Sequence, residues 1–344
     1  MPAFNFFTTA AEVVATLPER VSEKTCMYMF LSIKSNPLMT ESKFRLTYLA
    51  DNFLVVITGA SHGGLGGHTA LFLAAGKPAE VLLLGRSEDR VSPVIEEIRK
   101  ISPSTNARFV KIDLTSCASV RAAAAEINSL VSKIDVLINN AGIMAVKFAL
   151  TPEKVESHLG ANHIGHFLLT NLLVPKLEAS SSGARVVNVS SAMYQFSPVL
   201  FDNYNFSDGK TYNAWEAYGQ SKTANILFAM ALAMKLDKRG IKSYSLHPGV
   251  IEKTGLTSGV DPEAWTIVGP MFESKKMEAP KEKTIEQGCA TTIAAALDPA
   301  LDRYSGSFLD DCIPKKVLGY ASDSSNAEKL WILSEEIVGE KFSY

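Results

Sequence analysis

Short hydrophobic runs alternate with longer segments of helical character from Phe53 to the end of the chain. The runs are rich in leucine and β-branched residues, which favours strands. They lie at Leu54–Thr58, Glu80–Leu84, Ala107–Ile112, Ile134–Asn139, Arg185–Val189, Lys242–Leu246 and near Gly306–Leu309. Because repeated strand and helix units form parallel sheets, we expect one α/β domain. Its doubly wound parallel sheet should have about seven strands, with helices on both faces.

The longest predicted helix runs from Ala214 to about Lys238. Its apolar positions recur at intervals of three and four residues, which places them on one face of a helix. We therefore expect this face to pack against the sheet, with the side chains of Ala224, Leu227, Phe228, Ala231 and Met234.

The composition of the 344-residue chain is that of a globular protein, with 47% hydrophobic and 20% charged residues. Its 34 basic and 36 acidic residues give a net charge of −2, which leaves no excess of cations for a nucleic acid. The four scattered cysteines indicate neither a disulfide framework nor a zinc site, and they favour a reducing, cytoplasmic location. The longest apolar run near the N-terminus, Cys26–Ile33, is too short to span a membrane, and no secretory signal is recognised.

A glycine-rich loop connects the first predicted strand to the following helix. It contains Gly59, Gly63, Gly64 and Gly66. Glycines at such positions let the backbone approach a pyrophosphate at a helix N-terminus, as in Rossmann-type folds. A plain strand-to-helix turn is the alternative. The strand before the loop favours dinucleotide binding.

Arg86 follows the second predicted strand, at the position where an NAD-binding fold usually has a carboxylate for the ribose. A guanidinium attracts the 2′-phosphate of NADP, which a carboxylate would repel. The sequence therefore favours NADP over NAD. The alternative is that Arg86 is a solvated charge at a strand end.

Tyr218 and Lys222 are four residues apart on the longest helix and so share one face. A phenol is a poor acid or base near neutral pH unless a positive charge stabilises its anion. Lys222, together with an oxidised nicotinamide, could supply that charge and prepare Tyr218 for general acid–base catalysis. An ordinary surface pair on the helix is the alternative.

Further motifs follow the other predicted strands in a fixed order. They are Asp113 and Leu114, Asn139 to Gly142, Asn162, the pair Ser190 and Ser191, and Tyr218 with Lys222. This ordered set resembles the short-chain dehydrogenase/reductase superfamily from Phe53 onward. Ala214–Phe228 and Leu246–Val250 are similar to its retinol-dehydrogenase and WW-domain-oxidoreductase branch, which handles lipophilic alcohols and ketones with NADP.

The resemblance implies catalytic roles for three side chains besides Lys222. Ser191, with Ser190 as the alternative, would bind the substrate oxygen so that it faces Tyr218. Asn162 would maintain a water relay behind Lys222. Read without the family, the serine pair could be a helix N-cap and Asn162 a polar residue without special function.

The resemblance also implies a set of cofactor contacts besides Arg86. The glycine loop would hold the pyrophosphate, a second group would form the adenosine side, and a third would flank the nicotinamide. These residues are Gly59, Ser61, His62, Gly64, Leu65 and Gly66; Asp113, Leu114, Asn140, Ala141 and Gly142; and Tyr218, Lys222, Pro248, Gly249, Val250 and Thr254.

Two positions depart from the family spacing. The glycine loop is one residue longer than usual, with Gly63 as the insertion, which makes His62 a candidate contact for the 2′-phosphate. Thr254 comes one residue late for the usual carboxamide contact. His163, His166 and His247 lack ligand spacing and are expected to be ordinary packed or surface residues rather than metal ligands.

The segment before the first strand is anomalous for this family. Residues 1–25 should form an N-terminal helix and lead-in, with the helical pattern at Thr8–Thr25, whereas residues 26–52 show no clear amphipathic period. We interpret 26–52 as a possible retained intron, because Cys26–Tyr28 can encode a fungal-type splice donor. A genuine surface insertion or partner-binding arm is the alternative. Sequencing the transcript would decide between them.

The predicted function is that of an NADP-dependent oxidoreductase that interconverts an alcohol and a carbonyl on a small lipophilic molecule, with specialised metabolism as the expected setting. Residues 53–344 would be its catalytic domain, with substrate segments Met193–Asn213 and Thr254–Lys283. Homo-oligomerisation is possible. A non-enzymatic NADP sensor or scaffold is the alternative. Candidate residues for an apolar substrate pocket are Phe196, Phe201, Trp265, Met271, Phe272 and Met277.

Overall fold

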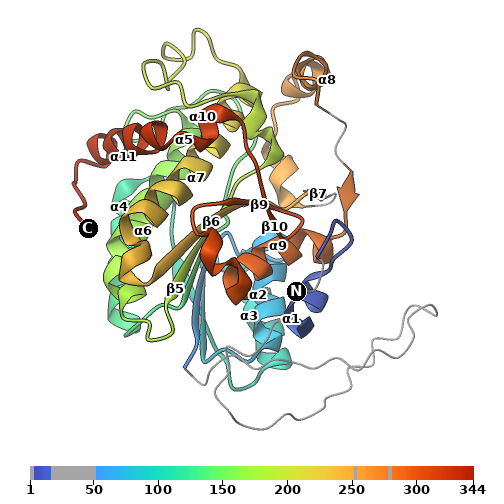
Figure 1. Ribbon diagram of the computed structural model, residues 1–344, viewed down its shortest axis with the longest axis vertical. Helices are drawn as coiled ribbons and strands as arrows, with labels where there is room; N and C mark the ends of the chain where they lie inside the picture. The colour runs from blue at the N-terminus through green and yellow to red at the C-terminus, as the bar shows by residue number, and fades with distance from the viewer. Residues whose placement is uncertain (1–3, 17–51, 252–253, 278–280) are drawn as a thin grey trace, which may run out of the picture.

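A central sheet of eight strands organises the computed structural model, which describes residues 4–16, 52–251, 254–277 and 281–344 (Figure 1). The strand order is β10-β9-β6-β5-β4-β1-β2-β3. The strands are β1 Leu54–Thr58, β2 Glu80–Gly85, β3 Asn106–Lys111, β4 Val136–Asn139, β5 Ala184–Val189, β6 Ile241–His247, β9 Phe308–Asp310 and β10 Ile313–Lys315. All neighbouring pairs are parallel except β9 with β10. The doubly wound parallel sheet predicted from the sequence is confirmed.

The sheet has one strand more than the seven expected, because β10 was not predicted. This strand has only three residues, and it pairs with β9 after a tight turn in which Asp311 and Cys312 have positive φ angles. Three residues that include Pro314 show no alternation of apolar and polar side chains. The sequence pattern therefore gives no sign of the strand.

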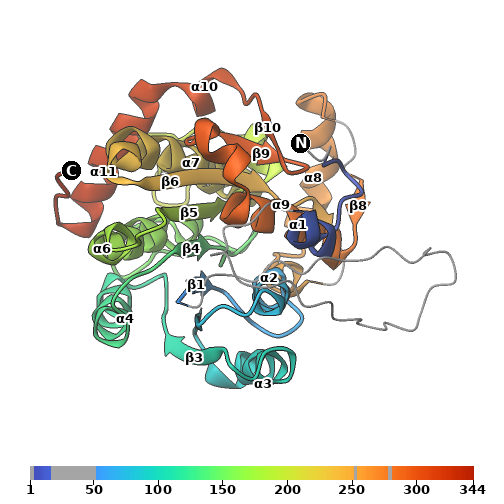
Figure 2. The same cartoon turned by 60° about the horizontal axis from the view of Figure 1, so that its bottom comes forward.

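The central strands are buried along their whole length because both faces of the sheet are covered. Every residue of β1 and of β5 is buried. Figure 2 shows helices on the two sides of the sheet. On one side lie α4 Cys117–Leu130, α6 Gly165–Glu178, α7 Ala214–Leu236 and α11 Ser324–Val338, and on the other α1 Ala10–Thr16, α2 Leu65–Ala75, α3 Ser92–Ile101 and α9 Ile285–Leu297.

Helix α7 begins at Ala214, as predicted, and its last turn passes into a short 3-10 helix, Asp237–Arg239. Four of the five residues assigned to its packed face are buried in the core. Met234 is the exception, with 57% of its surface exposed. The prediction for Met234 is wrong because the buried face of α7 continues through Leu232 and Leu236, whereas Met234 borders an open pocket.

A short helix lies within the segment predicted to form the N-terminal helix and lead-in. Helix α1 places Ala10, Val13 and Val14 in the same core as α9, and its start lies within the predicted helix. The rest of that prediction, and the proposed insertion at residues 26–52, lie outside the described residues. The intron hypothesis therefore stays a prediction.

Several further elements lie around the carboxyl edge of the sheet. Figure 1 shows α8 above this edge, apart from the helical layers. Within the part of the chain that the structure describes, no helix is both long and apolar enough to cross a membrane. The elements around the carboxyl edge are α5 Ser157–Leu159, a π-helical turn Gly160–Ile164, the paired strands β7 Val250–Ile251 and β8 Glu282–Lys283, α8 Ala264–Ser274 and α10 Gly319–Ser322.

Candidate active site

The sheet topology brings the predicted motifs together at one edge. Strands β1, β4, β5 and β6 are adjacent and parallel, and each is followed directly by one predicted motif. Carboxyl ends of parallel strands meet at the same edge of a sheet, which is where α/β proteins bind ligands.

The glycine loop packs directly against the segment that follows β4. Gly59 has a φ angle of +69°, and a Cβ atom there would lie 2.8 Å from the Cα of Ala141. A Cβ on Gly66 would lie 2.6 Å from the carbonyl oxygen of Gly59 and would also overlap the amide of Asn140. The amide of Asn140 donates a hydrogen bond to the carbonyl of Thr58 (2.9 Å). Both glycines are therefore needed for the close packing of these two segments.

The N-terminus of α2 is suited to bind an anion. The first turn of this helix has no acidic residue, and Gly64, at its N-cap, provides no side chain to bond the free N–H groups. Gly63 has open space on its Cα, and the loop is closed by a hydrogen bond from the Gly64 N–H to the Ser61 carbonyl (3.0 Å). The side chain of Leu65 packs inward, toward α9. Unbonded N–H groups at a helix N-terminus suit a pyrophosphate.

Arg86 is exposed just beyond the end of β2, on the strand next to β1. This position leaves its guanidinium accessible to a ligand beside the glycine loop. The side chain of His62 lies 3.3 Å from the Glu97 carboxylate on α3. The predicted contact of His62 with a phosphate would therefore compete with this contact to Glu97.

The residues predicted for the adenosine side have structural partners of their own. The Asp113 carboxylate accepts hydrogen bonds from the backbone N–H and the hydroxyl of Thr115 (3.0 and 2.7 Å). The backbone of Leu114 packs against Gly165 at the start of α6. This segment is fixed in place beside the edge of the sheet.

Tyr218, Lys222 and Ser191 meet at the ends of α7 and β5. The side chain of Ser191 lies beside the Tyr218 hydroxyl, where it lowers the pKa of this group. The Lys222 ammonium group lies 5.5 Å from the centre of the Tyr218 ring and donates a hydrogen bond to the carbonyl of Val189 (3.0 Å). Gly142 is beside this ammonium group. All three side chains are almost completely buried.

Burial dominates the titration of the two α7 side chains. It raises the pKa of Tyr218 to about 12, and the side chain of Ser191 offsets only part of this shift. It lowers the pKa of Lys222 to about 7. Lys222 alone therefore does not bring the phenol toward neutrality, and the predicted lowering needs the additional positive charge that the sequence argument assigned to an oxidised nicotinamide.

Ser190 and Ser191 face different partners. The Ser190 hydroxyl is buried and donates a hydrogen bond to the carbonyl of Lys222 (2.7 Å), which joins β5 to α7. The Ser191 hydroxyl lies beside Tyr218 and also accepts from the backbone N–H of Met193 (3.2 Å). Both the N-cap role and the proximity to Tyr218 thus belong to Ser191.

Asn162 connects three segments of the site. It lies in the π-helical turn, a feature often found at functional sites. Its side-chain oxygen accepts from the N–H of Ile143 (2.8 Å), and its amide donates to the Ser221 hydroxyl on α7 (2.9 Å). Its carbonyl is bonded to His166 (2.9 Å). These bonds hold the segment after β4 against α7, and the water relay stays a prediction.

The segment after β6 lies beside Ser191. The imidazole of His247 accepts a hydrogen bond from the N–H of Ala192 (3.1 Å). Pro248 and Gly249 follow, and the stem of Lys283 packs against Gly249. Val250 is in β7, whereas Thr254 begins a 3-10 turn beyond residues 252–253, which are outside the described residues.

An apolar cluster adjoins Tyr218. It contains Trp215 and the predicted pocket residue Phe196, with Met271, Phe272 and Met277 packed against it. Two predicted members are elsewhere. Phe201 packs against the main core on the α6 and α7 side, and Trp265 is 49% exposed, although its ring contacts that of Trp215. Sequence spacing alone does not distinguish the residues in this cluster from Phe201 and Trp265.

The sequence reasoning missed a buried pair next to Tyr218, Glu156 and His158. Both are completely buried, and they are 2.7 Å apart. An acidic residue directly before the apolar run of α5 and α6 is an N-cap signal and could have drawn attention to Glu156.

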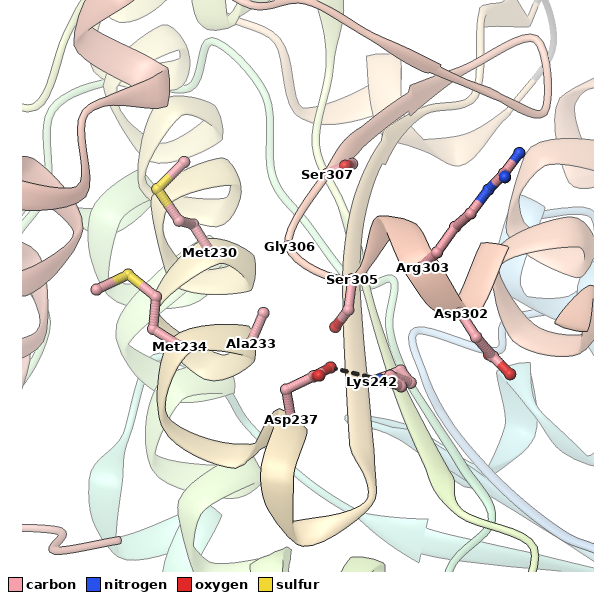
Figure 3. Close-up of a pocket in the computed structure, with 10 residues that line it drawn as sticks. All are labelled: Met230, Ala233, Met234, Asp237, Lys242, Asp302, Arg303, Ser305, Gly306 and Ser307. Atoms are coloured by element: carbon pink, nitrogen blue, oxygen red, sulfur yellow. Dashed lines mark hydrogen bonds and ion pairs between the residues drawn. The ribbon is translucent and has the colours of Figure 1, made fainter. Parts of the chain in front are cut away.

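An open pocket of about 530 Å³ lies at the opposite end of the sheet (Figure 3). It is bordered by Met230, Met234 and the ion pair of Asp237 with Lys242 (2.8 Å). Lys242 is at the amino end of β6. The pocket is therefore separate from the carboxyl edge that holds the predicted site.

Known proteins are similar to this chain in sequence and in architecture. The sequence profile of the short chain dehydrogenase family matches residues 54–265. Retinol dehydrogenase 12 of Mus musculus is 35% identical over 287 residues, which make up 83% of this chain and 86% of that protein. The chloroplastic short-chain dehydrogenase TIC 32 B of Brassica napus is 35% identical over 299 residues, covering 84% of this chain and 89% of that protein.

A solved structure extends the similarity to three dimensions. A protein of Mycobacterium paratuberculosis superposes with a TM-score of 0.64 and 33% sequence identity. The superposition covers 85% of this chain and 95% of that chain.

Proposed function

This chain belongs to the short-chain dehydrogenase family, in its retinol-dehydrogenase-like branch, and we propose that it interconverts an alcohol and a carbonyl on a small lipophilic molecule with NADP as cofactor. The observation that carries the proposal is the group of Ser191, Tyr218 and Lys222 at the carboxyl edge of the sheet. The glycine loop lies at the same edge, and the apolar cluster adjoins Tyr218.

Several residues fit a nicotinamide dinucleotide. The uncapped start of α2 suits the pyrophosphate, Arg86 the 2′-phosphate, and Lys222 the hydroxyl groups of the nicotinamide ribose. Such a cofactor supplies a hydride to a carbonyl carbon, or accepts one from an alcohol carbon.

The protein side chains would orient the substrate and move its proton. In the reducing direction the Tyr218 hydroxyl donates its proton to the substrate oxygen, and in the oxidising direction the phenolate takes the proton of the alcohol. Ser191 donates a hydrogen bond to the same oxygen, which fixes it opposite Tyr218. The ammonium group of Lys222 stabilises the phenolate that forms.

The proposed substrate class rests on the apolar cluster beside Tyr218. Phe196, Trp215 and Phe272 give this side of the site an aromatic surface. Relatives named retinol dehydrogenase support a lipophilic alcohol or its carbonyl form. A cytoplasmic location, self-association and a role in specialised metabolism stay predictions from the sequence. The sensor alternative is disfavoured because Ser191, Tyr218 and Lys222 are assembled together.

A turnover screen tests the proposal. The purified full chain would be incubated with NADPH and apolar aldehydes or ketones, or with NADP⁺ and alcohols, and nicotinamide absorbance followed. Tyr218→Phe should lower turnover by at least about 10²-fold, because it removes the acid–base hydroxyl, while NADPH binding is retained. The matched control is Tyr244→Phe, which removes a buried hydroxyl that donates to Leu301 far from the site. Equal turnover in wild type and Tyr218→Phe would contradict the proposal.

A further inference from the structure

Glu156 and His158 form a buried pair beside Tyr218 for which the reaction described above has no use. Neither side chain has any exposed surface, and the Oε1 atom of Glu156 lies 2.7 Å from Nδ1 of His158. Burying a charged or polar group is costly unless hydrogen bonds compensate. Such a pair therefore needs an explanation.

The carboxylate of Glu156 is fully bonded at the start of α5. Its two oxygens accept from the backbone N–H groups of His158 and Leu159 (2.9 and 3.1 Å) and from the hydroxyl of Ser157 (3.2 Å), in addition to the imidazole. The N–H of Glu156 itself donates to Asn205 (2.8 Å). The carboxylate is thus a fixed acceptor for the His158 ring.

The hydrogen bonds of His158 assign one tautomer. The backbone N–H of Val146 donates to Nε2 (3.2 Å), so Nε2 carries no proton. Nδ1 must then hold the proton that it donates to Glu156. Both ring nitrogens are engaged, which fixes the position and the orientation of the imidazole.

The fixed imidazole packs against the side of Tyr218. The two ring centres are 6.1 Å apart and the planes are inclined by 67°, an edge-to-face contact. Trp215 makes a second such contact with Tyr218 (6.4 Å, 80°). The phenol ring is therefore held between a side chain of its own helix and one from α5.

His158 also connects Tyr218 to both segments around the site. Val146, which donates to its ring, belongs to the segment that follows β4. The carbonyl of Val146 accepts a hydrogen bond from the hydroxyl of Tyr212 (2.7 Å), in the segment before α7. Burial and the nearby Glu156 raise the pKa of Tyr212, so this hydroxyl keeps its proton.

We propose that Glu156 and His158 are a positioning pair for Tyr218, holding the phenol ring and the Val146 backbone at a fixed distance from each other. Neither residue contacts the reacting atoms. The role depends on the proposed function, in which Tyr218 transfers the proton. A displaced phenol would face Ser191 less well, and misplacement of a reacting group by about 1 Å can cost on the order of 10²-fold in rate.

A double-mutant cycle tests the functional part. His158→Gln should lower kcat on the order of tenfold to a hundredfold, with little change in the Kd for NADPH. In a Tyr218→Phe background the same substitution should change the residual rate by less than about twofold, since no phenol hydroxyl remains to be positioned. An equal loss in both backgrounds would show that His158 acts through general folding and would overturn the proposal.

The matched control is His163→Gln. His163 is also completely buried and lies on the adjoining turn, but it bonds Ser334 (2.8 Å) and packs against Phe228, away from Tyr218. We expect kcat in this variant to stay close to wild type. If His158→Gln does not fold, Glu156→Gln provides the second variant. It keeps the imidazole but weakens its anchor, and it should lower kcat in the same direction.

A measurement that needs no substrate separates this proposal from the proposed function. The protein, with its 10 tyrosines replaced by fluorotyrosine, would be studied by ¹⁹F NMR, and the Tyr218 resonance identified by its loss in Tyr218→Phe. We expect one narrow resonance in wild type and His163→Gln, and a broadened or split one in His158→Gln. An unchanged Tyr218 resonance would overturn the proposal. Absence of turnover in wild type would instead contradict the proposed function.

Discussion

The side chain of Ser191 lies beside the Tyr218 hydroxyl, although the two residues are 27 positions apart in the sequence. The contact exists because β5 ends at Val189 and α7 returns along the same edge of the sheet. Among the described residues, Ser191 is the neighbour that lowers the pKa of the Tyr218 hydroxyl. We expect Ser191→Ala to raise the pKa of Tyr218 and to lower kcat by about 10²-fold, measured as a pH profile of alcohol oxidation.

Ser190→Ala is the comparison for that variant. The Ser190 hydroxyl donates a hydrogen bond to the Lys222 carbonyl, so removal of this hydroxyl should lower the free energy of unfolding by about 1 kcal/mol. The loss in kcat should be clearly smaller than for Ser191→Ala. A larger loss for Ser190→Ala would reassign the substrate-binding serine.

Arg86→Ala should discriminate between the two nicotinamide cofactors. The proposed function assigns the exposed guanidinium beyond β2 to the 2′-phosphate of NADP, and a charge-assisted hydrogen bond contributes about 1.5–3 kcal/mol. The Kd for NADPH should rise accordingly, with little change for NADH. Titration of nicotinamide fluorescence gives both values. Equal weakening for the two cofactors would show that Arg86 does not bind the 2′-phosphate.

Lys222→Met should change how stability depends on pH. Burial lowers the pKa of Lys222 from 10.5 to about 7, so between these values the unfolded chain binds a proton that the folded chain does not. The free energy of unfolding of wild type should therefore rise with pH across this window, relative to Lys222→Met. The difference should be a few kcal/mol, since one pKa unit corresponds to about 1.4 kcal/mol. Urea unfolding at several pH values measures it, and parallel curves would contradict the assignment.

The same substitution should also affect the reaction. Where Lys222 is protonated, its ammonium group is a favourable charge beside the Tyr218 phenolate, and Lys222→Met removes it. The pH profile of alcohol oxidation should then move to higher pH, and turnover should fall. A residual activity whose apparent pKa equals that of wild type would show that Lys222 does not stabilise the phenolate.

Acid sensitivity should come partly from His163. Burial lowers its pKa from 6.5 to about 3, with a further contribution from His166. The folded state therefore resists protonation, and stability should be lost as the pH falls from about 6.5 toward 3. In the same unfolding experiment, the free energy of unfolding of His163→Gln should fall less steeply over this pH range. A wild-type slope no steeper than that of the variant would contradict this cause.

The sequence predicted the parallel strands well because both faces of the sheet are covered. Strands such as β1 and β5 are buried throughout, so that apolar residues make up most of each strand. The pattern of apolar residues predicts burial less well at the end of a helix or in a very short strand. Met234 continues the apolar stripe of α7 but is exposed, and β10 is too short to form a pattern.

The candidate site could be predicted only as far as its residues occur in ordered motifs. Ser191, Tyr218 and Lys222 come together because each follows or faces the end of a strand. Glu156 and His158 have no such motif, and their importance arises from a ring contact with a residue 60 positions away. Only the folded arrangement shows it.

The edge strand β10 also affects how molecules of this protein meet one another. A sheet edge presents unpaired N–H and C=O groups on which a strand from a second molecule can assemble. In β10, Pro314 has no N–H to offer, and the neighbouring Lys315 is an exposed charge. The strand that ends this side of the sheet is thus a poor template for intermolecular pairing, which protects the long hydrophobic strands behind it from aggregation at high concentration.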